Sequence, residues 1–212
     1  ASANTAVGYN ALTANTTGGL NTALGESALL SNTTASYNVA IGREAAKATT
    51  TGWGNVAIGH QTFIANTTGE KNTAVGINAL AANTTAHENT AVGRNALTAN
   101  TTGANNTAHG SYALTANTTG TRNVAIGAVA LDNGNANNDT VAIGYASLSN
   151  TSNTSAGNTA VGSFSLLSNT GSNNVAVGYS SLYANTTGGT NTAIGRLALC
   201  KNTTGSDNTA LG

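Results

Sequence analysis

The chain has 212 residues, and its seven basic and seven acidic side chains cancel to a formal net charge of zero. This balance argues against electrostatic capture of DNA, RNA or an acidic membrane surface. Charged residues make up only 7% of the chain, against about 25% in ordinary globular proteins. No apolar run approaches the ~18 residues of a membrane-spanning helix, and the single cysteine, Cys200, has no partner for a disulfide within the chain.

A short phrase, Asn-[Thr/Val]-Ala-[Val/Ile/Leu]-Gly, recurs along the whole chain, and each copy begins at the seventeenth position after the start of the one before. The step from Thr140 to Asn158 is one residue longer, and the next step, to Asn174, is one residue shorter, so the two cancel. We number the repeat from the first residue of the phrase, so position one falls at Asn4, Asn21, Asn38, Asn55, Asn72, Asn89, Asn106, Asn123, Thr140, Asn158, Asn174, Asn191 and Asn208. A fixed short period is typical of an array whose units bury their apolar faces by stacking.

We therefore expect one repetitive domain over residues 1–212, with complete repeats at 4–207 and a partial repeat at 208–212. The missing initial Met and the partial repeat suggest a piece of a longer chain.

Positions two to four of each repeat alternate in the manner of a short strand, and Asn and Gly bound them as turn residues. Recurrent Gly and β-branched residues argue against helix. The predicted strands are 5–7, 22–24, 39–41, 56–58, 73–75, 90–92, 107–109, 124–126, 141–143, 159–161, 175–177, 192–194 and 209–211. Two short strands and two corners in each repeat would make one coil of a parallel β-solenoid. Twelve such coils, stacked at ~4.8 Å, predict an all-β rod roughly 58 Å long.

Strand geometry places positions two and four on one side and position three on the other. Because positions two and four carry Thr, Val, Ile or Leu, we predict that they form the core. Position three is then outward, and its invariant Ala predicts close packing against another copy of the chain. The alternative is that Ala lines the interior of a narrow single-chain solenoid. The predicted subunit-interface ladder is Ala6, Ala23, Ala40, Ala57, Ala74, Ala91, Ala108, Ala125, Ala142, Ala160, Ala176, Ala193 and Ala210.

An Asn-Thr-Thr triplet fills positions twelve to fourteen of most repeats and satisfies the acceptor rule for N-glycosylation. Glycans in successive coils would be crowded at ~4.8 Å spacing. The alternative is a corner in which stacked Asn amides form a ladder beside a column of Thr. The candidate glycosylation sites are Asn15, Asn32, Asn66, Asn83, Asn100, Asn117, Asn185 and Asn202, and Asn138, Asn150 and Asn153 also satisfy the rule.

Other candidate sites are weaker. Threonine columns favour ice binding only if two columns share a flat face, and we expect Thr16 and Thr17 to point to opposite sides.

His109 replaces an aliphatic residue, and in a trimer three such histidines can meet around an ion; the alternative is a tolerated neutral side chain. Glu26, Arg43 and Glu44 gather on one edge, but without a cleft they predict a solvated edge rather than an enzyme. No metal or cofactor motif is present.

The copies Asn38–Gly42, Asn55–Gly59 and Asn123–Gly127 read N-V-A-I-G. They resemble the head repeats of trimeric autotransporter adhesins (YadA-like), and the Asn-Thr-Thr-Gly corner is similar to repeats in bacterial surface proteins and phage-type tail fibres. The resemblance implies a left-handed parallel β-roll, three chains around a common axis, and a place on a cell surface or virion. The repeat here is longer than in the adhesin heads, and the chain shows no neck, heptad stalk or membrane-anchor motif.

We therefore expect a stiff extracellular fibre or filament segment that presents multivalent or tip-located binding sites. Its expected partners are copies of itself, as a homotrimer or an end-to-end filament, and a surface glycan or host receptor. The first alternative is a solenoid that recognises an extended surface such as polysaccharide or ice. The second alternative is a glycan-degrading, tailspike-like enzyme.

Overall fold

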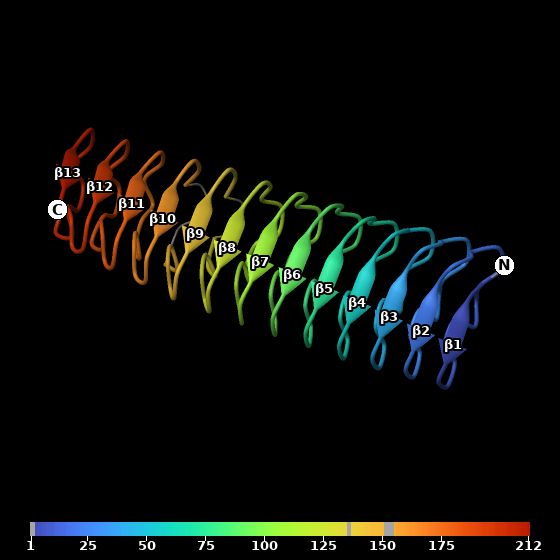
Figure 1. The fold of residues 1–212 in the computed structure, drawn as a ribbon. Helices are drawn as coiled ribbons and strands as arrows, with labels where there is room; N and C mark the ends of the chain where they lie inside the picture. The colour runs from blue at the N-terminus through green and yellow to red at the C-terminus, as the bar shows by residue number, and fades with distance from the viewer. Residues whose placement is uncertain (1–2, 135–136, 151–154) are drawn as a thin grey trace.

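The computed structural model describes residues 3–134, 137–150 and 155–212. Over these residues the chain forms thirteen three-residue strands and no helix, and the strands lie in chain order in one parallel sheet (Figure 1). The strands are β1 (Thr5–Val7), β2 (Thr22–Leu24), β3 (Val39–Ile41), β4 (Val56–Ile58), β5 (Thr73–Val75), β6 (Thr90–Val92), β7 (Thr107–His109), β8 (Val124–Ile126), β9 (Val141–Ile143), β10 (Thr159–Val161), β11 (Val175–Val177), β12 (Thr192–Ile194) and β13 (Thr209–Leu211). The predicted all-β parallel solenoid is confirmed.

The register of the sheet follows the repeat. Ala57 of β4 pairs with Ala74 of β5, and each strand places its central Ala opposite that of its neighbour. The one longer and the one shorter repeat leave this register intact, because Ala160 pairs with both Ala142 and Ala176. Length variation is therefore absorbed outside the strands.

The opposite side of each coil is a run of turns rather than the predicted second strand. Positions seven and nine adopt positive φ, as in Ser27 (58°) and Leu29 (49°). The backbone therefore alternates between two conformations, and the N–H groups of this side reach both neighbouring coils. Ser27 N–H donates to the carbonyl of Tyr9 in the preceding coil at 2.8 Å, whereas Leu29 N–H donates to that of Ala45 in the following coil at 3.0 Å. The coils are hydrogen-bonded on both sides although only one side is a sheet.

The core lies between the strand and the turns, and it reverses our assignment of the two strand faces. The position-three alanines, including Ala57 and Ala74, are fully buried within the single chain in all eleven internal coils. They pack in one cluster with the position-nine leucines such as Leu80 and the position-eight alanines such as Ala79. A narrow coil that holds Leu from the turn side has room for only a methyl group from the strand.

The predicted subunit-interface ladder is therefore the internal core of one chain. Its buried members are Ala23, Ala40, Ala57, Ala74, Ala91, Ala108, Ala125, Ala142, Ala160, Ala176 and Ala193. Ala6 is exposed and Ala210 half-buried, because each belongs to a coil at one end of the described stack. In this fold the ladder offers no continuous surface to a second chain, and the alternative, a narrow single-chain interior, describes these residues.

Two other positions hold the coils in register. At position one, Asn72 N–H donates to Oδ1 of Asn55 at 2.9 Å, and its side-chain amide donates to the carbonyl of Ala86 at 2.9 Å, which closes its own coil. At position five, Gly93 has a φ of 136°, and a β-carbon there would lie 2.5 Å from the carbonyl oxygen of Gly110. The chain therefore needs Gly for both conformation and space.

Candidate functional surfaces

The outer face of the sheet carries the side chains of positions two and four. Several position-four residues are well exposed, including Leu24 (46%), Ile126 (40%) and Ile194 (43%). We call these two columns the outer sheet face; its residues are Thr5, Thr22, Val39, Val56, Thr73, Thr90, Thr107, Val124, Val141, Thr159, Val175, Thr192 and Thr209 at position two, and Val7, Leu24, Ile41, Ile58, Val75, Val92, His109, Ile126, Ile143, Val161, Val177, Ile194 and Leu211 at position four. Only His109 among them is titratable. A continuous, nearly uncharged face of this kind is uncommon on a monomer.

His109 lies exposed on this face, between Val92 of β6 and Ile126 of β8. Across the residues that the structure covers, no three His, Cys, Asp or Glu side chains gather closely enough to hold a metal ion. The ion shared between three copies of His109 remains a prediction that depends on assembly.

The Asn-Thr-Thr corner forms the predicted amide ladder. The side-chain amide of Asn117 donates to Oδ1 of Asn100 at 2.9 Å, and that of Asn100 donates to Oδ1 of Asn83 at 3.0 Å. Each amide also closes its own corner, as in the bond from Asn100 to the carbonyl of Gly103 at 3.0 Å. The nitrogen that N-glycosylation would modify is therefore the donor that holds the corner.

Burial removes most of the candidate glycosylation sites from the surface. The fold leaves no room for a glycan at the fully buried residues Asn32, Asn66, Asn83, Asn100, Asn117 and Asn185. Asn15 and Asn202 are half-buried near the two ends of the stack, and the amide of each donates to the carbonyl of the Gly three residues later. Asn153 lies outside the described residues.

The threonines of the corner differ from their predicted orientation. Thr33 is half-buried and Thr34 is exposed, so both reach the surface, because positions thirteen and fourteen form a bend rather than a strand. Thr33 Oγ1 donates to the carbonyl of Thr50 in the next coil at 3.1 Å. These two columns, which we call the threonine corner, continue without interruption through seven coils, to Thr118 and Thr119.

The charged edge is a network of ion pairs. Arg43 lies 3.3 Å from Glu26 and 3.4 Å from Glu44, and Lys47 lies 2.8 Å from Glu44. Hydrogen bonds from Lys47 and then from Gln61 lower the pKa of Glu44 to about 2. A general acid needs a raised pKa, so this arrangement favours a solvated ionic edge over a pair of catalytic carboxylates.

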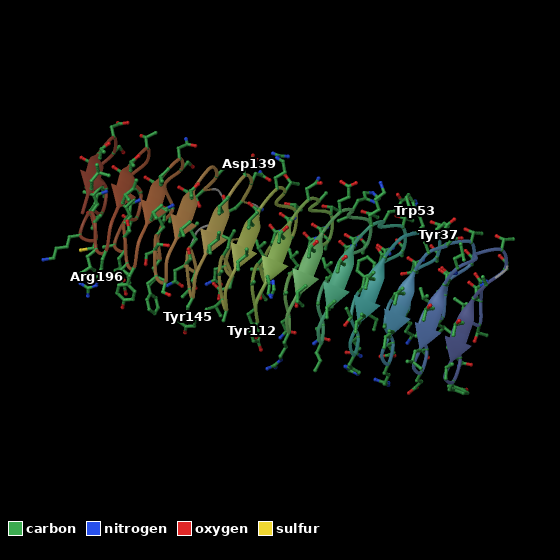
Figure 2. All side chains as sticks on the ribbon, viewed as in Figure 1. Tyr37, Trp53, Tyr112, Asp139, Tyr145 and Arg196 are labelled. Carbon is green, nitrogen blue, oxygen red and sulfur yellow. The ribbon has the colours of Figure 1, made fainter. Side chains whose placement is uncertain are left out.

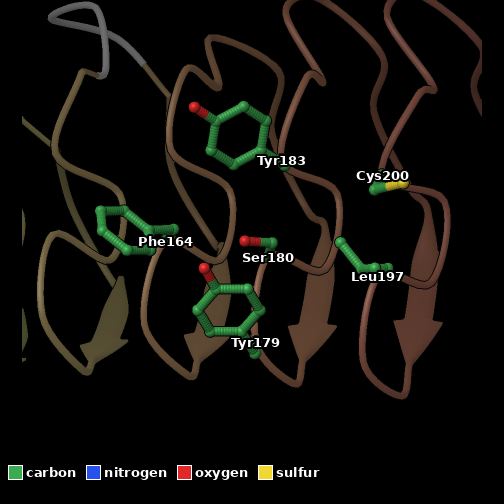
Figure 3. Close-up of a pocket in the computed structure, with 6 residues that line it drawn as sticks. All are labelled: Phe164, Tyr179, Ser180, Tyr183, Leu197 and Cys200. Carbon is green, nitrogen blue, oxygen red and sulfur yellow. The ribbon is translucent and has the colours of Figure 1, made fainter.

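An aromatic cluster lies on one long edge of the rod, where Figure 2 shows Tyr145 and Arg196. The ring centroids of Tyr145 and Phe164 are 5.4 Å apart and those of Phe164 and Tyr179 are 6.0 Å apart, both in edge-to-face arrangement. Beside them Tyr183, Ser180 and Leu197 help to line an open hollow of about 370 Å³ (Figure 3). We call Tyr145, Phe164, Tyr179 and Tyr183 the aromatic strip.

Our sequence reasoning did not identify this strip. The signal was present, because Tyr145, Phe164 and Tyr179 occupy position six or seven of three successive repeats. Stacking those repeats in register brings the rings together, so an alignment of the repeats by position would have found them.

Comparison with known proteins finds no family model, no curated protein and no solved structure that matches this chain. Within the part of the chain that the structure covers, no helix is long and apolar enough to span a bilayer.

Proposed function

We propose that this chain is a stiff segment of an extracellular fibre that associates with copies of itself through the outer sheet face. The stiffness has a structural basis, because each coil is tied to the next by the sheet and by turn-side hydrogen bonds, and most coils also by two Asn ladders. A body of this kind holds binding sites at a distance and repeats them in register.

The observation that carries the proposal is the outer sheet face itself. Its exposed and half-buried side chains form two columns along all thirteen strands, and such continuity suits an interface of the standard ~800 Å² per partner. The face is built from β-branched and aliphatic side chains, and contains one titratable residue, His109. Such a surface favours burial against an identical surface over exposure to water.

The number of chains and the location follow from the resemblance stated above. The repeated phrase resembles trimeric autotransporter heads and tail-fibre repeats, and it favours a homotrimer on a cell surface or virion. In such a trimer the outer sheet faces, rather than the alanine ladder, would meet at the common axis.

Sedimentation equilibrium of the purified chain tests the proposal. We expect a particle of three times the 20.7 kDa mass of one chain. Ile58→Lys combined with Val75→Lys places charges on two neighbouring strands of the face, β4 and β5, and should yield monomers with an unchanged circular dichroism spectrum. Thr68→Lys, on the threonine corner, serves as the control and should leave the mass unchanged. A wild-type particle with the mass of a single chain would contradict the proposal.

The threonine corner favours a second candidate function, recognition of an extended repetitive surface such as ice. Its specific support is the pair of exposed or half-exposed threonine columns that runs through seven coils. This function predicts thermal hysteresis that falls when Thr68 and Thr85 are replaced by Lys. A freezing point equal to the melting point for the wild-type chain would eliminate it.

A further inference from the structure

The aromatic strip is a concentration of side chains that the fold does not require. The chain contains nine aromatic residues, and four of them, Tyr145, Phe164, Tyr179 and Tyr183, lie in three successive coils. Tyr145, Tyr179 and Tyr183 are 53%, 49% and 43% exposed. Phe63, by contrast, is fully buried in the core. Burial in the core therefore does not explain the position of these exposed rings, and their clustering indicates a surface that binds a ligand.

The strip is shaped to receive something narrow and long. Its rings follow one another along the rod axis, since Tyr145, Phe164 and Tyr179 come from consecutive coils at spacings of 5.4 and 6.0 Å. Within the coil of β11, Ser180 lies between Tyr179 and Tyr183, and Leu197 bounds the hollow in the next coil (Figure 3). The hollow is open to solvent, so a chain-like ligand can lie across it without any movement of the protein.

Polar groups border the rings. The guanidinium of Arg196 lies over one side of the Tyr179 ring, 5.8 Å from its centre, and among the described residues it makes no ion pair with a carboxylate. The tyrosine hydroxyls both donate and accept hydrogen bonds, whereas the guanidinium only donates them. Apolar ring faces with hydrogen-bonding groups at their rim complement a pyranose, whose C–H face packs on the negative π-face of an aromatic ring and whose hydroxyls project sideways.

Two other classes of ligand fit less well. Nucleic acid requires a basic groove, and this chain has no net charge. A protein partner requires about 800 Å² per side, and three exposed tyrosines with Leu197 are too few side chains to supply that area. We therefore propose that the aromatic strip binds a neutral oligosaccharide laid along the rod, with the ring of Tyr179 as its main stacking surface.

This inference deepens the proposed fibre function by naming the chemical class of its ligand, but binding itself needs only the folded coils. Isothermal titration calorimetry of the full chain against neutral hexasaccharides of glucose, mannose, galactose and N-acetylglucosamine tests it directly. We expect at least one to bind with a saturable isotherm. Tyr179→Ala should weaken that affinity at least tenfold, whereas Tyr179→Phe, which keeps the ring, should weaken it much less.

Tyr9→Ala is the matched control, because Tyr9 occupies the same repeat position in the first coil and is exposed but stands outside the strip. It should leave the affinity unchanged. No binding by any of the four sugars, or equal loss in Tyr9→Ala and Tyr179→Ala, would overturn the proposal. If Tyr179→Ala instead lowers the sedimenting mass and leaves sugar affinity intact, the strip is a contact between chains and the proposal is wrong.

The mass of each sample separates this proposal from the fibre proposal. If the wild-type chain is a monomer but binds sugar through Tyr179, the sugar site is supported and self-association is contradicted. If the chain is a trimer but binds none of the sugars, self-association is supported and the sugar site is contradicted.

Discussion

The side-chain amide of Asn100 donates to the side-chain oxygen of Asn83, one coil earlier, at a distance of 3.0 Å, and both residues are fully buried. The same amide donates to the carbonyl of Gly103, and Oδ1 of Asn100 accepts from Asn117 at 2.9 Å. One side chain thus joins three coils and closes a corner. Because the coils have little apolar bulk, we expect such polar ladders to be a main source of stability in this rod.

Asn100→Ala should destabilise the chain by about 3 kcal/mol, since it leaves the buried Oδ1 of Asn83 without its donor and removes one acceptor from the amide of Asn117. Urea unfolding followed by circular dichroism measures the change. Thr102→Ala, in the same corner but exposed, is the control and should be nearly neutral. An unfolding midpoint for Asn100→Ala equal to that of the control would show that the ladder contributes nothing.

The ladder has a gap that a substitution can repair. In the third repeat position twelve is Thr49, and Oδ1 of Asn32 in the coil below is buried with no hydrogen-bond partner. Above it, the amide of Asn66 reaches Thr49 Oγ1 only at 3.4 Å. Thr49→Asn would supply a donor to Asn32 and an acceptor to Asn66, so we expect a gain of about 1 kcal/mol in unfolding free energy. Thr51→Asn, at an exposed position, should give no gain; equal effects of the two would refute the repair.

Gly93→Ala should be among the most damaging single changes, at about 4 kcal/mol, because it combines a φ that favours Gly with overlap of backbone atoms. Gly54→Ala is the matched control: its φ is 68°, but the new β-carbon would meet only Lys71 Cγ at 3.8 Å. There we expect only the left-handed backbone cost of about 1 kcal/mol. Thermal melts of the two variants measure the difference, and similar melting temperatures would contradict the close stacking of the position-five glycines.

The pKa of Glu44 makes part of the stability dependent on pH. Its pKa falls from 4.5 to about 2, chiefly through the hydrogen bond from Lys47 and then that from Gln61. A lowered carboxyl pKa stabilises the folded state above pH 4.5, and this contribution disappears as the pH falls toward 2. Glu44→Gln should therefore lower the melting temperature at neutral pH and have little effect near pH 2. A difference that stays constant between the two conditions would contradict the assignment.

Much of the fold follows from residue spacing. The recurrence of the Asn-[Thr/Val]-Ala phrase predicted the thirteen strands and their register, and the Asn-Thr-Thr triplet predicted the amide ladder at Asn83 and Asn100 as one of two alternatives. These features could be predicted because stacked coils place the same repeat position of each coil directly above that of the coil before. Residues that share a repeat position are therefore neighbours in space.

Which face of each strand points into the core could not be predicted in the same way. Alternation shows that Ala57 and Ile58 lie on opposite sides, but it does not show which side is inside. The answer depends on Leu80, which reaches the core from a turn where its φ is 51°, a conformation that Leu rarely adopts. The resulting narrow interior accepts Ala and leaves Ile58 outside. The neighbours of Tyr179, by contrast, could be predicted from the sequence, because Tyr145 and Phe164 occupy adjacent positions of the two preceding repeats.

Cryo-electron microscopy of the assembled particle would show whether the outer sheet faces meet. We predict strands stacked at ~4.8 Å, with three chains whose Ile58 and Val75 side chains face one another across a shared axis and whose Ala57 and Ala74 stay inside each chain. A particle in which the outer sheet face is exposed to solvent, or in which the alanine columns of different chains touch, would contradict it.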